Sequence, residues 1–498
     1  MTFEHGVASG DPLGDRVLIW TRVESSRDEE RVEWTLARDP ALRDGVARGE
    51  AIARAEDDHT VTVDVAGLEP GATYWFRFAG GGSRSPVGRT RTLPDGELAR
   101  LAVCSCAKYS AGHFAAYRRL SERDDLDLVL HLGDYLYEYP DQPEQGIGSA
   151  IGRAMEPPGP AVTLEDYRRR YAEYRRDPDL QALHARHPVA ATIDDHEVCE
   201  NAWSGGAKDH DSRRQGPWPE RRAAAMRAWR EWLPSRAAPG DPPRIHRRMA
   251  LGDLADLFLL DARSHRDEQA KGPAVDDPGR SMLGADQLGW LLDGLGGSRA
   301  RWRLVGSPVM IGQVATRYMP GDLGDPLSEL GILTARDHGP APDQWDGYPA
   351  ERDRLLAAVQ ERGLEGLVFL SGDVHTSWAV DLRRDGAPPD SPALAVELVT
   401  PSITSENLDE HLDVPEQRED HDIEDEVRRC NPHVRWVDLD RHGYLVVEIT
   451  PERVRGEWWF VESVRRPARG LELGAAWCAE RGSPGLQLAP GPAGSRER

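Results

Sequence analysis

The chain contains the stretch Leu128-Val129-Leu130-His131-Leu132-Gly133-Asp134-Tyr135-Leu136-Tyr137, in which an apolar run of strand length ends in Gly-Asp. A mainly apolar run of this length is typical of a strand buried on both faces of a sheet. Open α/β sheets bind their ligands just beyond the carboxyl ends of such strands. We therefore expect an α/β sheet whose functional groups begin at Asp134.

Three further polar clusters follow apolar runs in the same way. They are Cys104-Ser105-Cys106, Asp194-Asp195-His196-Glu197 and Gly372-Asp373-Val374-His375. Thiol, carboxylate, imidazole and phenol groups gathered at one sheet edge are suited to holding metal ions. The sequence thus predicts a metal-dependent hydrolase, and we expect phosphate esters as its substrates.

Each cluster also has a simpler explanation. Asp134 can be a helix N-cap with Tyr137 in the core, and residues 194–197 can form a solvated charged turn. Cys106 alone is a weak signal, because buried thiols are often only small core residues. Three carboxylates around one imidazole repel one another unless cations offset their charge, and this favours the metal site.

The composition excludes several classes of protein. The net charge of −23 argues against a surface that binds nucleic acid or an anionic membrane. No apolar run is long enough to span a bilayer, and five cysteines in 498 residues do not form a disulfide framework. The start of the chain lacks a signal-peptide pattern, so we expect a cytoplasmic protein as written, or an exported one if a leader is missing. Oligomeric state is not predicted.

The pattern of the chain predicts three parts. Residues 1–95 read as a small β-sandwich similar to fibronectin type III domains, with a turn followed by Tyr74. In residues 99–465 strands alternate with helices, including long charged stretches over 164–186 and 219–233, which predicts a layered sheet-and-helix domain. Residues 466–498 are expected to pack on that domain as a C-terminal tail with a frayed end.

Three segments are expected to lie outside the regular elements. Two are long loops that we expect to carry specificity, and the third is a strongly acidic excursion; they are residues 204–217, 318–348 and 406–426.

Taken together, the clusters resemble the calcineurin-type metallophosphoesterases and, more closely, the PhoD-type alkaline phosphatases. The resemblance runs from Phe3 to about Val464 and includes, in order, residues 6–12, 131–139, 194–203, 343–348, 371–378 and 441–444. It implies an α/β fold, a layered metallophosphatase sandwich (α/β/β/α) that follows the N-terminal β-sandwich. It also implies Fe³⁺ and Ca²⁺ as cofactors and a small phosphate ester as substrate.

The resemblance assigns metal-binding roles residue by residue. Asp134 matches the carboxylate that bridges the ions, and Tyr137 matches a phenolate ligand. The full set of implied metal ligands is Cys106, Asp134, Tyr137, Asp195, Asp373 and His375. Thiolate, phenolate and imidazole suit ferric iron, whereas carboxylates suit calcium.

Asp134, His196 and Arg263 are the residues expected to take part in catalysis. A metal-bound hydroxide or oxide is expected to attack phosphorus, while His196 donates a proton to the leaving alkoxide or binds the phosphoryl group. Arg263 follows an apolar strand and can grip phosphate bidentately, or else form a structural salt bridge. Asn201 is the candidate for a further phosphate or metal contact, because the chain departs there from the family pattern.

The expected activity is hydrolysis of phosphomonoesters, extending to phosphodiesters if the cleft is open. One alternative is a phosphodiesterase that acts on teichoic-acid-like or phospholipid head groups. An alternative of another class is a calcium-stabilised binding protein without catalysis. That last alternative is disfavoured, because an active site that has lost catalysis should also have lost at least one type of metal ligand, and none is missing here.

Overall fold

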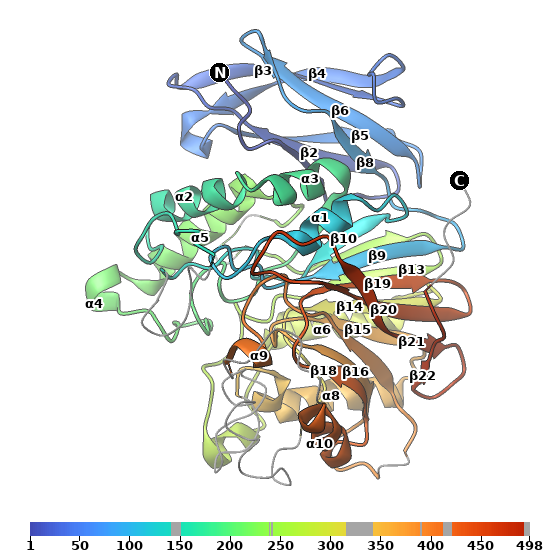
Figure 1. Ribbon diagram of the computed structural model, residues 1–498. Coiled ribbons are helices and arrows are strands. Elements are labelled where there is room, and N and C mark those ends of the chain that lie inside the picture. The colour runs from blue at the N-terminus through green and yellow to red at the C-terminus, as the bar shows by residue number, and fades with distance from the viewer. Residues whose placement is uncertain are drawn as a thin grey trace.

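The computed structural model describes residues 1–140, 151–238, 240, 243–314, 342–388, 391–411 and 421–492. The expected loop over 318–348, the acidic excursion over 406–426 and the frayed C-terminal end therefore lie partly outside the described residues. In Figure 1 the N-terminal strands lie at the top, helices α2 (Leu164–Tyr174) and α3 (Pro178–Arg186) lie beneath them, and α8 (Pro349–Glu361) and α10 (Asp422–Cys430) lie at the bottom.

A ten-stranded sheet forms one half of the larger domain. Its centre is parallel: β9, β10, β11 and β1 run side by side, and the register aligns Cys104 of β9 with His131 of β10. Their carboxyl ends therefore meet at one edge of the sheet. The strands in spatial order are β22 (Leu486–Leu488), β21 (Leu471–Glu480), β20 (Arg453–Val461), β19 (Gly443–Ile449), β9 (Ala99–Cys104), β10 (Leu128–His131), β11 (Pro188–Ala191), β1 (Val7–Gly10), β2 (Arg16–Arg22) and β5 (Thr60–Ala66).

A seven-stranded sheet forms the other half. Strands β13, β14, β15 and β17 are parallel, whereas the remaining three strands pair antiparallel. The spatial order is β12 (Arg247–Leu251), β13 (Ala255–Leu259), β14 (Trp302–Ser307), β15 (Leu367–Ser371), β17 (Ala395–Val399), β16 (Ser377–Leu382) and β18 (Val434–Asp438).

The two sheets pack face to face with helices on both outer faces. One apolar cluster joins Leu101 and Leu130 of the first sheet to Leu257 and Leu304 of the second. A second cluster buries the outer face of the ten-stranded sheet under α1 (Ala115–Ser121), α2, α3 and α5 (Trp218–Trp232). A third buries the outer face of the other sheet under α6 (Gly284–Gly297), α8 and α10. This arrangement confirms the predicted α/β/β/α sandwich.

The described chain also contains short helical elements near the loops. They are η1 (Ala55–Asp57), α4 (Ser212–Gln215), η3 (Gly272–Asp276), η4 (Trp345–Gly347) and α9 (Leu408–His411). None of the described helices is long and apolar enough to cross a lipid bilayer.

The N-terminal residues form the predicted β-sandwich. Its second sheet consists of β3 (Glu29–Ala37), β4 (Gly45–Arg54), β6 (Thr73–Gly80), β7 (Ser83–Arg84) and β8 (Gly88–Arg91). Its core contains Ile19, Leu36 and Phe76, all fully buried. The Tyr74 hydroxyl accepts a hydrogen bond from the Glu69 N–H at 2.9 Å, so this tyrosine fixes its turn as the fibronectin-like pattern predicts.

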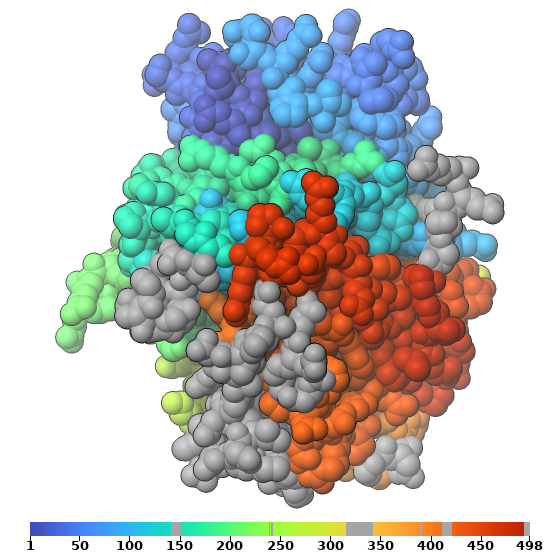
Figure 2. Space-filling model, viewed as in Figure 1, coloured from blue at the N-terminus to red at the C-terminus, as the bar shows by residue number. Residues whose placement is uncertain are grey.

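The N-terminal strands are joined to the larger domain by hydrogen bonds. Strand β1 pairs in parallel with β11, and Asp11 just after it forms an ion pair with Arg247 at 2.6 Å. In Figure 2 the blue N-terminal residues meet the green residues below them without a gap on the visible face. The division at 1–95, 99–465 and 466–498 stays a prediction, because strands from all three parts share the ten-stranded sheet.

Gly10 marks a position where the backbone of β1 closely approaches its neighbours. A Cβ atom there would lie 2.2 Å from the Pro234 carbonyl oxygen and 2.7 Å from that of Val189. We expect Gly10→Ala to lower the free energy of unfolding by about 1–3 kcal/mol, because backbone atoms must shift to admit the methyl group. Denaturant unfolding measures this change. Gly14→Ala is the matched control, since no atom lies within 4 Å of the position that its Cβ would take, and equal stability of the two variants would contradict the close approach.

Candidate metal centre

The four polar clusters meet where the parallel strands of the two sheets end. Cys106 follows β9, Asp134 follows β10, Asp195 follows β11 and Asp373 follows β15. All four side chains are buried or nearly so. The sheet edge predicted from the sequence is thus the place where these residues come together.

Four of the predicted ligands have backbones in the left-handed region. The φ angles are 59° at Cys106, 52° at Asp134, 70° at Asp373 and 57° at His375. Such conformations cost roughly 1–3 kcal/mol each for residues other than glycine and are concentrated at functional sites. The fold therefore holds these four side chains in orientations that the backbone alone would not favour.

Gly133 allows the loops after β10 and β11 to touch. Its φ is +109°, and a Cβ atom there would lie 2.4 Å from the Asp194 nitrogen. Glycine is required at so close an approach. The neighbouring Asp134 is thereby brought to the carboxylates that follow β11.

One half of the centre contains sulfur, phenol and imidazole groups. Ligand atoms of Cys106, Asp134 and His375 lie within 4.8 Å of one another. The Tyr137 hydroxyl donates to Asp134 Oδ2 at 3.0 Å and lies 3.3 Å from His375 Nε2. Nδ1 of His375 donates to the Glu406 carbonyl at 2.7 Å, which fixes the tautomer and makes Nε2 the candidate ligand atom.

The other half is rich in oxygen. Ligand atoms of Asp134, Asp194, Asp195 and Asp373 also lie within 4.8 Å of one another. Asp134 belongs to both halves, as a bridging carboxylate should.

The guanidinium of Arg263 lies within this acidic group and is almost fully buried. Its Nε contacts Asp194, its Nη2 donates to Asp373 at 2.9 Å and its Nη1 donates to Asp343 at 2.7 Å. Asp195 lies 3.5 Å from the same group. Arg263 thus reaches the predicted site, where carboxylates from three segments of the chain surround it.

His196 stands at the junction of the two halves. A ligand atom of His196 lies within 4.8 Å of those of Asp134 and Asp195, and its ring packs on Tyr137 with the ring centroids 4.1 Å apart. Its Nδ1 donates to Glu138 Oε2 at 2.8 Å, while its Nε2 lies 3.6 Å from Glu200. Although burial lowers the pKa of His196, the charges of Asp195, Asp134 and Glu138 raise it well above the ordinary value.

Asn201 contributes through its backbone. Its N–H donates to Asp195 Oδ2 at 2.5 Å, whereas its side-chain amide donates to Glu200 Oε1 at 3.2 Å. Its φ of 52° is again left-handed. The observed contact therefore orients one of the predicted ligands.

The chemistry of these donors fits bound cations. Burial and the charge of Asp134 raise the pKa of both the Cys106 thiol and the Tyr137 phenol well above their ordinary values. Asp195 Oδ1 is buried without a hydrogen bond from any described residue. A cation would reverse this local field, favour thiolate and phenolate, and compensate the crowded carboxylates.

Several residues around the site had no role in the sequence interpretation. Glu138, Asp343 and Gln344 contact His196, Arg263 and Asp373 respectively. Glu138 and Asp343 are acidic residues inside stretches already noted for their family resemblance, and this was the available signal. Their partners could not be read from the sequence, because they lie up to 80 residues away.

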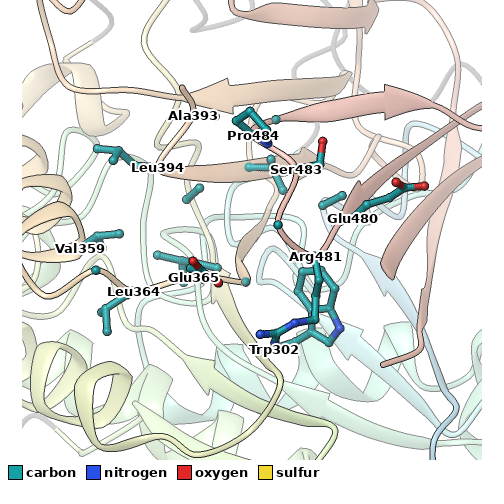
Figure 3. A pocket seen from close by; sticks show the side chains of 18 of the residues that line it. Trp302, Val359, Leu364, Glu365, Ala393, Leu394, Glu480, Arg481, Ser483 and Pro484 are labelled. Carbon is teal, nitrogen blue, oxygen red and sulfur yellow. The ribbon is translucent and has the colours of Figure 1, made fainter. Parts of the chain in front are cut away.

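A separate pocket lies at the opposite ends of the strands. Figure 3 shows Trp302, Leu364 and Arg481 among its lining side chains. Trp302 begins β14 and Leu367 begins β15, whereas Asp373 follows the end of β15. The pocket therefore shares no residue with the candidate metal centre.

Comparisons with known proteins cover both the sandwich and the metal centre. A family model described as PhoD-like phosphatase matches residues 101–458, and one described as PhoD-like phosphatase, N-terminal domain, matches residues 1–94. Alkaline phosphatase D of Bacillus subtilis (strain 168) is 33% identical over 509 residues, which cover 97% of this chain and 82% of that protein. A solved structure described as "Structure of PhoD" superimposes with a TM-score of 0.86 at 31% identity, over 99% of this chain and 92% of the other.

Proposed function

Because the chain belongs to the PhoD-like phosphatase family, we propose that it is an alkaline phosphatase that hydrolyses phosphomonoesters. The observation that carries the proposal is the meeting of two ligand groups at Asp134, one with Cys106 and His375, the other with Asp195 and Asp373. Two adjoining groups that share a carboxylate suit a centre with more than one cation.

We propose iron for one half and calcium for the other. Cys106, Tyr137 and His375 would hold Fe³⁺, because thiolate, phenolate and imidazole suit that ion. Asp195 and Asp373 would hold Ca²⁺, which prefers oxygen ligands, and Asp134 would bridge the two. When bound, such cations neutralise phosphate oxygens and lower the pKa of water.

His196 is the proposed proton donor to the leaving alkoxide. The hydrogen bond from Nδ1 to Glu138 fixes the plane of the ring, and the charge of that carboxylate, which is not among the proposed metal ligands, favours the protonated imidazole. Asn201 supports the site by holding Asp195 through its backbone N–H.

Arg263 has two proposed roles, of which its contacts favour the second. To grip phosphate, the guanidinium must present a pair of N–H groups to the substrate. To fix the acidic pocket, it must bind the carboxylates, as it does with Asp194, Asp343 and Asp373.

A substrate survey with metal analysis tests the proposed function. Protein purified without chelator is expected to hydrolyse p-nitrophenyl phosphate faster at alkaline than at neutral pH, and to contain iron and calcium by elemental analysis. A visible ferric–phenolate absorption band is expected as well. Bis(p-nitrophenyl) phosphate, assayed in parallel, separates monoesterase from diesterase activity. Failure of the metal-loaded protein to turn over either ester would end the proposal.

A further inference from the structure

Asp343 begins a short segment that runs along the acidic half of the centre and leads into η4. Its carboxylate accepts hydrogen bonds from Arg263 Nη1, Arg266 Nη2 and Gln269 Nε2, each at 2.7 Å. Arg266 also donates to the backbone carbonyl of Asp343 at 3.0 Å. These bonds hold Asp343 in one orientation, although it belongs to none of the ligand groups.

Gln344 continues the same contact with the centre. Its Nε2 donates to Asp373 Oδ2, and its Oε1 accepts a hydrogen bond from the Met310 N–H at 2.8 Å. The bond to Met310 fixes which end of the amide faces Asp373. One proposed calcium ligand is therefore oriented by an uncharged donor that is itself held by the backbone.

Arg263 and a bound cation compete for the same carboxylates. The guanidinium binds Asp194 and Asp373 directly, and both belong to the oxygen-rich group. Asp343 binds the same guanidinium from outside that group. The negative charge of Asp343 therefore offsets part of the positive charge of Arg263. Arg263 then holds Asp194 and Asp373 less strongly, and their carboxylate oxygens can bind a cation.

We propose that Asp343 and Gln344 are positioning residues that set the affinity of the acidic pocket for its divalent cation. Asp343 acts through Arg263, and Gln344 acts on Asp373. The inference rests on the proposed function, because it takes Asp195 and Asp373 as calcium ligands. Residues that orient metal ligands typically change metal affinity by about 10–100-fold when they are replaced.

Calcium titration of the full chain tests the inference. Chelator-treated Asp343→Asn protein is expected to bind Ca²⁺ roughly 10–100-fold more weakly than the chelator-treated wild type, as measured by isothermal titration calorimetry. Asparagine keeps the size of the side chain but removes the charge that attracts Arg263. Thermal melting without calcium, run in parallel, establishes that the variant is folded.

Asp346→Asn is the matched control. Asp346 lies in the same segment and is more deeply buried than Asp343, but it forms an ion pair with Arg352 and accepts a hydrogen bond from the Val314 N–H at 3.0 Å. Neither partner belongs to the candidate centre. This variant is expected to be less stable than the wild type and to keep its calcium affinity.

The outcomes separate the inference from the proposed function. Wild-type protein that binds no calcium would remove the calcium assignment itself. Calcium binding by Asp343→Asn that equals that of the wild type and of Asp346→Asn would overturn the inference alone. If Asp343→Asn does not fold, Gln344→Leu supplies the test. Loss of the hydrogen bond from the Gln344 side-chain amide to Asp373 is also expected to weaken calcium binding.

Discussion

Replacement of Asp134 by alanine is expected to reduce kcat for phosphomonoesters by roughly four orders of magnitude. Asp134 belongs to both ligand groups. Its carboxylate also accepts a hydrogen bond from the Tyr137 hydroxyl at 3.0 Å and one from the backbone N–H of His196 at 3.3 Å. On the proposed metal assignment, alanine would leave the two cations without the carboxylate that they share. Steady-state kinetics together with elemental analysis should show that activity and metal content fall together.

Asp127→Ala is the matched control for this variant. Asp127 is also a fully buried aspartate, but it precedes β10, where it accepts from the Arg100 N–H at 2.9 Å and pairs with Arg91 at 2.8 Å. Its loss is expected to lower stability while the folded protein keeps its metals and its kcat. Near-normal turnover by Asp134→Ala would contradict the assignment of the active site.

His196→Gln is expected to discriminate between substrates by their leaving groups. For alkyl phosphates we expect a loss of roughly 10²–10⁴-fold in kcat/KM, because the departing alkoxide needs a proton from the enzyme. For p-nitrophenyl phosphate the loss should be far smaller, since p-nitrophenolate is stable without a proton. Parallel kinetics with both esters measure the difference.

Glu138→Gln tests the same proton donation by His196 and is expected to have a smaller effect. Glu138 accepts from His196 Nδ1 and from the Glu200 N–H at 2.7 Å, so an amide can keep only one of these two bonds in good geometry. We expect the same dependence on the leaving group with a smaller amplitude. Equal losses for both esters in the two variants would indicate that His196 binds substrate or supports the fold rather than donating a proton.

The sequence was most informative where each motif directly follows its strand. Apolar runs predicted β9, β10, β11 and β15, and the parallel arrangement then brings Cys106, Asp134, Asp195 and Asp373 to one edge. The spacing of a strand and the polar residues after it is local information. This is why the polar clusters could be located without knowledge of the fold, whereas the choice of metal ligands within them came from the resemblance to the PhoD-type phosphatases.

Other features depend on contacts that a linear pattern does not contain. The charged stretch over 164–186 suggested one long helix, but α2 ends at Tyr174 and α3 begins at Pro178, with Asp177 as its N-cap. Proline at the first helical position favours such a new start. The ion-pair partners of Arg263 could not be predicted from the sequence either, because the guanidinium and its carboxylate partners are brought together by both sheets.

The course of the chain through the ten-stranded sheet has a consequence for its assembly. Ser9 pairs with Pro188, and Val103 pairs with Leu445, so central strands find their neighbours only after most of the polypeptide exists. Pairings so distant along the sequence slow folding. A fragment that lacks the first strands would also present β11 as an unprotected edge, which invites aggregation. Expression of the phosphatase portion by itself should therefore yield insoluble material, even though every proposed metal ligand would be encoded.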